Sequence, residues 1–117
     1  MRVDVSGVDE IAPGQVRRVR VGPVDVVLVR RADGSFRALR DRCSHQGGAL
    51  SGGRLEPMVE GDHLGEYRFS ERRMVLRCPL HQFEFDVDTG RSPADPERYR
   101  VRAYPVTVEN GRVFIER

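Results

Sequence analysis

Short aliphatic runs separated by turn residues recur along most of the chain. Residues 15–21 interleave valine with arginine, and residues 24–29 are aliphatic except for Asp25. Both runs are too short for a buried helix and are rich in β-branched valine, which favours extended chain. The pattern therefore predicts two adjacent strands, of which the second is buried.

Two dipeptides in this pattern predict β-hairpins. Asp33-Gly34 separates the strand at residues 24–29 from another at 36–39. Asn110-Gly111 separates alternating residues before it from a strand at 112–116. Asn-Gly and Asp-Gly favour tight hairpin turns because their residues tolerate the positive φ that such turns require.

The remaining segments predict loops and an edge strand. Residues 8–11 are too short for an α-helix and are followed by Pro13-Gly14, and residues 91–99 contain two prolines and predict a crossover loop. Pro105 lacks an N–H to donate, so its strand should lie at a sheet edge or be bulged there. Many short strands within 117 residues predict a single all-β domain, built as a small antiparallel sandwich or barrel.

Composition narrows the possible functions. The 20 basic residues are all arginine and face 18 acidic ones, a net charge of +2. This balance does not favour nucleic acid as a partner, and the absence of lysine excludes Schiff-base chemistry. The sequence has no targeting segment and no apolar run long enough to span a bilayer, so we expect a cytoplasmic protein without a membrane partner.

Two short segments carry the chemistry. The chain has two cysteines and three histidines, and each cysteine is followed closely by a histidine, in Cys43-Ser44-His45 and in Cys78-Pro79-Leu80-His81. Thiolate together with imidazole suits zinc or an iron–sulfur cluster. Structural zinc sites usually pair cysteine with cysteine and histidine with histidine, a spacing that this sequence lacks.

The C-x-H and C-x-x-H pairs resemble the Rieske [2Fe–2S] family, in particular the ferredoxin components of Rieske non-haem iron oxygenase systems. Other positions of the two family boxes match as well, namely Gly47, Leu50 and Pro79. The resemblance implies one [2Fe–2S] cluster per chain, with Cys43 and Cys78 on one iron and His45 and His81 on the other. It also implies a Rieske-type β fold in which two loops form a cluster-binding subdomain.

The same resemblance suggests boundaries within the chain. We expect a single Rieske domain over residues 1–117, with the cluster-binding part at about 41–90 and an extended hairpin insertion at about 54–77. In that hairpin, residues 66–69 alternate, residues 70–73 predict the turn, and residues 74–77 lead back into the second box.

Three positions differ from the family pattern. Gln82 stands where glycine usually follows the second histidine. Phe83 and Phe85 stand where high-potential members have serine and tyrosine, whose hydroxyls donate hydrogen bonds to sulfur. Such bonds stabilise the reduced cluster, so we expect a potential at the low end of the Rieske range of about −150 to +300 mV.

The resemblance implies one-electron transfer from a flavin-dependent reductase to a terminal oxygenase. The third histidine, His63, lies in the insertion, and we expect it to be a solvated loop residue. One spare histidine cannot build the two-histidine, one-carboxylate iron centre of an oxygenase, so we expect an electron-transfer component rather than a stand-alone enzyme. Two alternatives remain open: a Rieske subunit of a larger oxidoreductase, and a non-redox binding or regulatory module with a structural metal.

Overall fold

The computed structural model describes residues 1–44, 47–60, 68–80 and 83–117. These residues form ten strands in three antiparallel sheets and two single-turn 3₁₀ helices, at Val8–Glu10 and Leu50–Gly52. In this part of the chain no helix has the length and apolar character needed to cross a membrane. The sequence prediction of an all-β antiparallel fold is confirmed.

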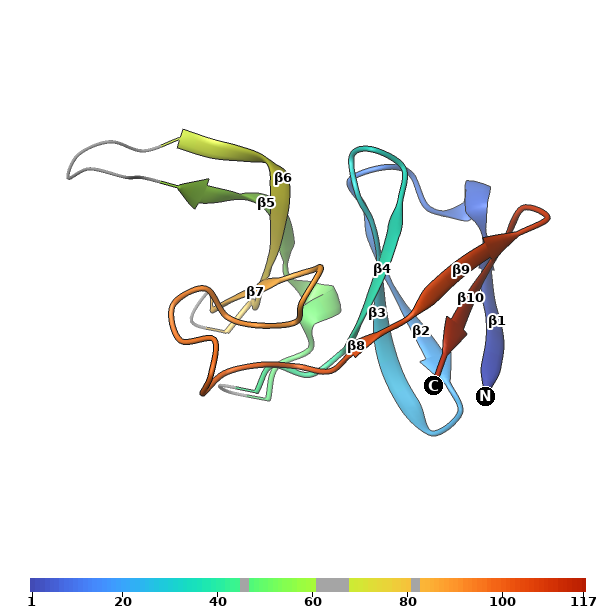
Figure 1. Ribbon diagram of the computed structural model, residues 1–117. Coiled ribbons are helices and arrows are strands. Elements are labelled where there is room, and N and C mark those ends of the chain that lie inside the picture. Colours follow the sequence, from blue (N-terminus) through green and yellow to red (C-terminus); the bar gives the residue numbers. More distant parts are fainter. Residues whose placement is uncertain (45–46, 61–67, 81–82) are drawn as a thin grey trace.

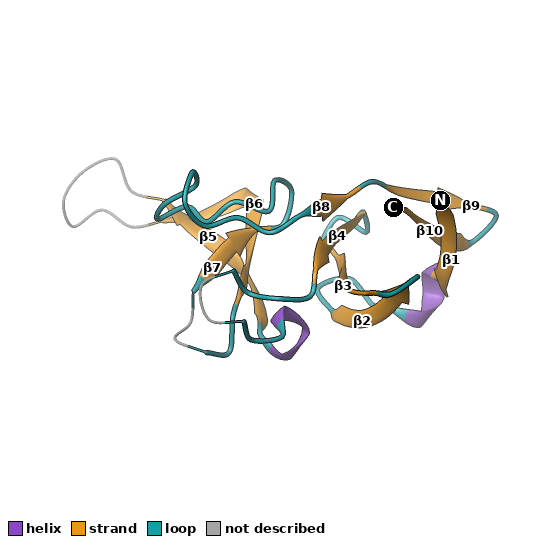
Figure 2. Cartoon of the chain, turned by 90° about the horizontal axis from the view of Figure 1, so that it is seen from below, coloured by secondary structure: helices purple, strands orange, loops and turns teal. Residues whose placement is uncertain are grey.

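The strands divide into a base and a protruding lobe (Figure 1). The base contains a sheet of order β1-β10-β9 and a sheet of order β2-β3-β4-β8, whereas the lobe is the sheet β5-β6-β7. The bounds are β1 Arg2–Gly7, β2 Val16–Val21, β3 Val24–Arg30, β4 Phe36–Arg40, β5 Arg54–Glu60, β6 Arg68–Arg77, β7 Glu84–Asp86, β8 Ala103–Tyr104, β9 Val106–Glu109 and β10 Arg112–Glu116. The two termini lie side by side at the base (Figures 1 and 2).

Both predicted hairpins of the base are confirmed. Asn110 and Gly111 have φ of 50° and 74°, and they join β9 to β10 with Glu109 opposite Arg112. Gly34 has φ of 89° in the loop between β3 and β4. These positive values are what Asn-Gly and Asp-Gly supply at low cost.

Pro105 lies between the edge strands β8 and β9, where the chain passes from one base sheet to the other. This confirms the predicted edge position. Residues 91–99 form a loop, also as expected. The pattern does not predict β1, whose register shifts between Asp4 and Ser6 and whose alternation is broken there.

The hairpin of the lobe differs from its prediction at the turn. The sequence predicts a turn at residues 70–73, but they lie within the continuous strand β6, which pairs with β5 from Arg54 opposite Arg77 to Glu60 opposite Arg68. Residues 66 and 67 of the predicted alternating segment lie outside the described residues. A run of Ser, Glu and Arg resembles a turn in sequence. In the structure it lies in β6 opposite the register shift between Pro57 and Val59, and the strands pair on both sides of that shift.

Strand β3 is buried on both faces. Val26 and Leu28 point into one apolar core, and Val27 and Val29 into a second. Successive side chains of a strand point to opposite faces, so one sheet serves as a wall for both cores. This explains why residues 24–29 form a nearly continuous aliphatic run rather than an alternating one.

The two cores lie on opposite sides of the β2-β3-β4-β8 sheet. The first joins the two base sheets through Ile11, Val19, Val21, Phe36, Ala38, Tyr104, Val113 and Ile115. The second lies between the β2-β3-β4-β8 sheet and the lobe, and it contains both cysteines together with Leu39, Leu50, Leu76, Phe85, Val87 and Val101.

Gly90 closes the loop after β7 against the second core. Its φ is +76°, and a Cβ placed on it would lie 2.2 Å from the carbonyl oxygen of Val101. The Val101 N–H donates to the Gly90 carbonyl at 2.7 Å, so the two backbones cannot separate without losing this bond.

We predict that Gly90→Ala lowers the free energy of unfolding by about 3 kcal/mol, because left-handed strain and a backbone clash act together. Gly14 is the matched control: its φ is +87°, and a Cβ placed on it would have nothing within 4 Å. Gly14→Ala should cost only the strain, about 1 kcal/mol. Urea denaturation of both variants measures the difference, and equal losses would contradict the predicted clash.

Candidate metal centre

Two loops bring the cysteines of the chain together in the second core. Cys43 lies three residues after the end of β4, and Cys78 follows β6 directly. They are 1% and 0% exposed, and neither forms a disulfide. The two thiols are close enough for a hydrogen bond and an electrostatic interaction between them. Residues 35 positions apart in sequence are thus placed as a pair of sulfur donors.

The first loop is closed by backbone hydrogen bonds around Cys43. The Cys43 N–H donates to the Gly48 carbonyl at 2.7 Å, and the Gly47 N–H donates to the Cys43 carbonyl at 2.7 Å. Gly47 has φ of +77°, a conformation that residues with a Cβ rarely adopt. These bonds hold the cysteine at the neck of a tight loop.

Asp41 holds the start of the same loop in place through hydrogen bonds to its carboxylate. Its carboxylate accepts hydrogen bonds from the Ser51 N–H at 2.6 Å, the Ser51 hydroxyl at 2.6 Å and Arg18 Nε at 2.8 Å. The carboxylate side chain is fully buried, and buried charges require such partners. Asp41 could not be recognised from the sequence, because nothing local associates it with Ser51 or Arg18.

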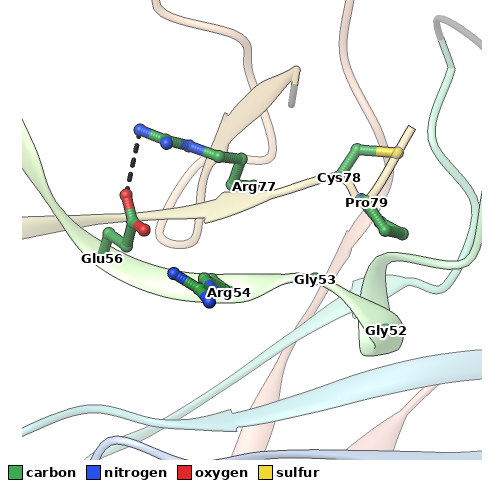
Figure 3. Close-up of a pocket in the computed structure, with 7 residues that line it drawn as sticks. All are labelled: Gly52, Gly53, Arg54, Glu56, Arg77, Cys78 and Pro79. Atoms are coloured by element: carbon green, nitrogen blue, oxygen red, sulfur yellow. Dashed lines mark ion pairs between the residues drawn. The ribbon is translucent and has the colours of Figure 1, made fainter. Parts of the chain in front are cut away.

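The second loop is closed in a similar way. The Cys78 N–H donates to the Phe83 carbonyl at 2.7 Å. Arg77, the last residue of β6, pairs with Glu56 at 2.9 Å and with Glu84 at 3.3 Å. Figure 3 shows the first of these pairs beside Cys78 and Pro79, along a hollow of about 290 Å³.

The two loops touch through Gly48. A Cβ at this position would lie 2.9 Å from Leu80 Cδ1 and 3.2 Å from the Cys78 sulfur. The absence of a side chain therefore lets the first loop approach the second cysteine closely.

The surroundings of Cys78 favour its neutral thiol when no cation is present. Burial raises the pKa of the Cys78 thiol, and the adjacent Cys43 thiol raises it further. The Leu80 N–H acts in the opposite direction, because it donates to the Cys78 sulfur and stabilises the thiolate. A bound metal ion supplies the positive charge that deprotonates such thiols outright.

Phe83 and Phe85 lie next to the cysteines, as predicted. Phe85 is 0% exposed in the core that contains both sulfurs, and its ring centroid is 5.5 Å from that of Phe83. Phe83 also packs edge-on against Tyr99, with centroids 4.9 Å apart. Neither phenylalanine has a hydroxyl to donate to sulfur.

The histidines and one further position are not placed. His45, His81, His63 and Gln82 lie outside the described residues. Of the four predicted ligands the structure therefore describes Cys43 and Cys78. These two fit an iron–sulfur group, because both are buried, unpaired by a disulfide and adjacent, and because a backbone N–H already donates to one sulfur.

Comparison with known proteins leads to the same chemistry. The family model of the Rieske [2Fe–2S] domain matches residues 1–105. The 3-phenylpropionate/cinnamic acid dioxygenase ferredoxin subunit of Photorhabdus laumondii is 32% identical over 111 residues, which cover 95% of this chain and 90% of that protein.

Two solved structures share the fold over almost the whole chain. The ferredoxin of carbazole 1,9a-dioxygenase from Nocardioides aromaticivorans IC177 is 30% identical, with a TM-score of 0.75 over 98% of this chain and 96% of that one. A candidate small subunit of an NADH-dependent nitrite reductase from Mycobacterium tuberculosis is 27% identical, with a TM-score of 0.80 over 100% and 95% of the two chains. With two loop cysteines buried side by side and the family model matching from the first residue to Pro105, the chain belongs to the Rieske [2Fe–2S] domain family.

Proposed function

We propose that the chain is a mobile one-electron carrier that binds its [2Fe–2S] cluster through Cys43, His45, Cys78 and His81. When bound, the cluster supplies one reversible one-electron redox step. The observation that carries the proposal is the meeting of the two buried thiols of Cys43 and Cys78 from separate loops. The histidines of both motifs would complete the set.

The residues around the sulfurs define what the protein contributes. Burial of both cysteines excludes water from the thiolates. The Leu80 N–H donates to one sulfur and so helps to hold negative charge there. Phe83 and Phe85 give the site apolar contact without a further donor, which supports a potential at the low end of the Rieske range.

The proposed partners are a flavin-dependent reductase as donor and an oxygenase-type protein as acceptor. The support is that this chain resembles, over almost its full length, proteins named as ferredoxin components of dioxygenase systems. We propose the cytoplasm as the compartment, where thiols remain reduced and available as ligands. We propose one Rieske domain over residues 1–117, with a cluster-binding part at about 41–90 and the hairpin at about 54–77 as its insertion.

A second candidate function is that of a fixed Rieske subunit in a larger oxidoreductase. It is favoured by the similarity to the candidate nitrite reductase small subunit, whose fold matches with a TM-score of 0.80. The two functions differ in stoichiometry, because a carrier exchanges between partners whereas a subunit stays bound to one.

The ligand set is tested by substitution. Cys43→Ser, Cys78→Ser, His45→Ala and His81→Ala should each abolish the iron and sulfide content of the purified protein, along with its reddish-brown colour. Each change removes one of the four bonds that hold the two irons. His63→Ala is the matched control and should keep both. Loss of the cluster in the His63 variant, or its retention in the His81 variant, would contradict the assignment.

The reduction potential is expected in the lower part of the range of about −150 to +300 mV. Phe85→Tyr should raise it by about 40 mV, since one hydrogen bond of about 1 kcal/mol to the reduced site corresponds to that shift in a one-electron couple. Phe114→Tyr on β10 adds the same hydroxyl outside the cysteine core and should leave the potential unchanged. Voltammetry measures both, and a wild-type potential near +300 mV would refute the expectation.

The carrier and subunit functions are distinguished by measuring the steady-state turnover rate of the acceptor as the ratio of this chain to acceptor is increased. A carrier should give a rate that keeps rising well beyond one chain per acceptor, since each chain must leave to be reduced again. A rate that saturates at a ratio of one, with a complex that stays intact on gel filtration, would favour the subunit.

A further inference from the structure

Four exposed arginines gather beside the first loop. They come from two segments of the same form, Arg40-Asp41-Arg42 at the end of β4 and Arg100-Val101-Arg102 before β8. In each segment the middle residue is buried and the flanking arginines are exposed. We refer to Arg40, Arg42, Arg100 and Arg102 as the arginine patch.

Backbone pairing places the two segments side by side. The Arg40 N–H donates to the Arg102 carbonyl at 2.9 Å, and Leu39 lies opposite Ala103 in the adjoining β4–β8 pair. All four arginines line one hollow of about 370 Å³, whose other lining residues are Cys43, Ser44 and Val101. In Figure 1 the chain before β8 runs along the side of the first loop. The arginine patch thus adjoins a proposed iron ligand.

The charge of the arginine patch is not neutralised within the described part of the chain. Arginines elsewhere form ion pairs, such as Arg112 with Asp4 at 2.9 Å and Arg37 with Asp88 at 2.7 Å. The four patch arginines form no ion pair with any described residue. The nearby carboxylates of Asp41 and Asp25 contact Arg18, at 2.8 and 3.8 Å.

A fifth arginine strengthens the positive charge. Arg91 lies opposite Arg100 across an isolated antiparallel bridge, and like charges that face each other across strands destabilise the pairing. An anionic surface placed over the patch would remove this repulsion. Guanidinium groups suit carboxylates in particular, because they bind them through two parallel hydrogen bonds.

We propose that the arginine patch is the docking surface for a carboxylate-rich face of the electron acceptor protein. The inference rests on the proposed carrier function and adds where and by what chemistry the acceptor binds. A contact over the hollow would bring the acceptor against the Cys43 loop, and opposite charges raise the rate of productive encounter.

The test measures how fast the reduced holoprotein is oxidised by two small probes of opposite charge. Hexacyanoferrate(III) stands for an anionic acceptor and hexaammineruthenium(III) for a cationic one, each followed by stopped flow at 10 and 500 mM salt. The variant is Arg40→Glu/Arg100→Glu, because neither side chain makes a hydrogen bond, ion pair or ring contact with another described residue that its loss would break. The control is Arg20→Glu/Arg117→Glu, which makes the same charge change beside Gly22 in the base.

At low salt the patch variant should react about tenfold more slowly with hexacyanoferrate(III) and faster with hexaammineruthenium(III), and at high salt both effects should shrink to less than twofold. The control should change by less than twofold with either probe. Equal effects in the control, or a change of the same sign with both probes, would overturn the proposal. If charge reversal prevents folding, Arg40→Gln/Arg100→Gln should show the same pattern at about half the logarithmic size.

Competition by charged polymers tests whether the partner surface is rich in carboxylates. Poly-L-glutamate should slow the oxidation of wild type by hexacyanoferrate(III) and leave the patch variant unaffected. No effect on wild type, or stronger inhibition by a double-stranded DNA of equal charge, would overturn the proposal. Calorimetric binding of poly-L-glutamate to the purified chain, expected to weaken at least tenfold in the patch variant, decides the matter even if the chain proves to hold no cluster. Absent visible absorbance would then count against the carrier function alone.

Discussion

Burial of strand β3 on both faces is the constraint on which the rest of the structure depends. Its successive side chains pack alternately into two cores, one that joins the base sheets and one that contains the cysteines. Val27 and Val29 therefore support the metal centre from a strand that is also the middle of the base. A polar residue at either position would leave the cysteine core without its wall, since apolar burial is the main stabilising term in such a core.

The metal centre is assembled from short elements fixed to that wall. Asp41 ties the first loop to Ser51 and to Arg18 of β2, and Gly48 leaves room for the second loop beside the Cys78 sulfur. The same β4–β8 pairing that positions Cys43 also brings the arginine patch to the surface next to it. Ligand burial and partner recognition thus depend on one piece of backbone geometry.

The parts of this fold that could be predicted from sequence are those with a local cause. Asn110-Gly111 specifies its turn by backbone preference, and the Cys-His spacing specifies the chemistry by ligand type. The predicted turn of the long hairpin was wrong because residues 70–73, although polar, lie within β6 at a register shift, and nothing local marks the paired residues on either side of them. Asp41 was missed for a similar reason: its partners come from distant segments, and only the folded chain brings them together.

The central claim is that two cysteines and two histidines hold one [2Fe–2S] cluster. The most direct measurement is pulsed electron paramagnetic resonance of the dithionite-reduced protein. The protein is produced in cells supplied with ¹⁵N-labelled histidine. The account predicts a Rieske-type signal with an average g below that of all-cysteine clusters and hyperfine coupling to two histidine nitrogens. A signal without histidine coupling, or a colourless protein that contains zinc and gives no signal, would contradict it.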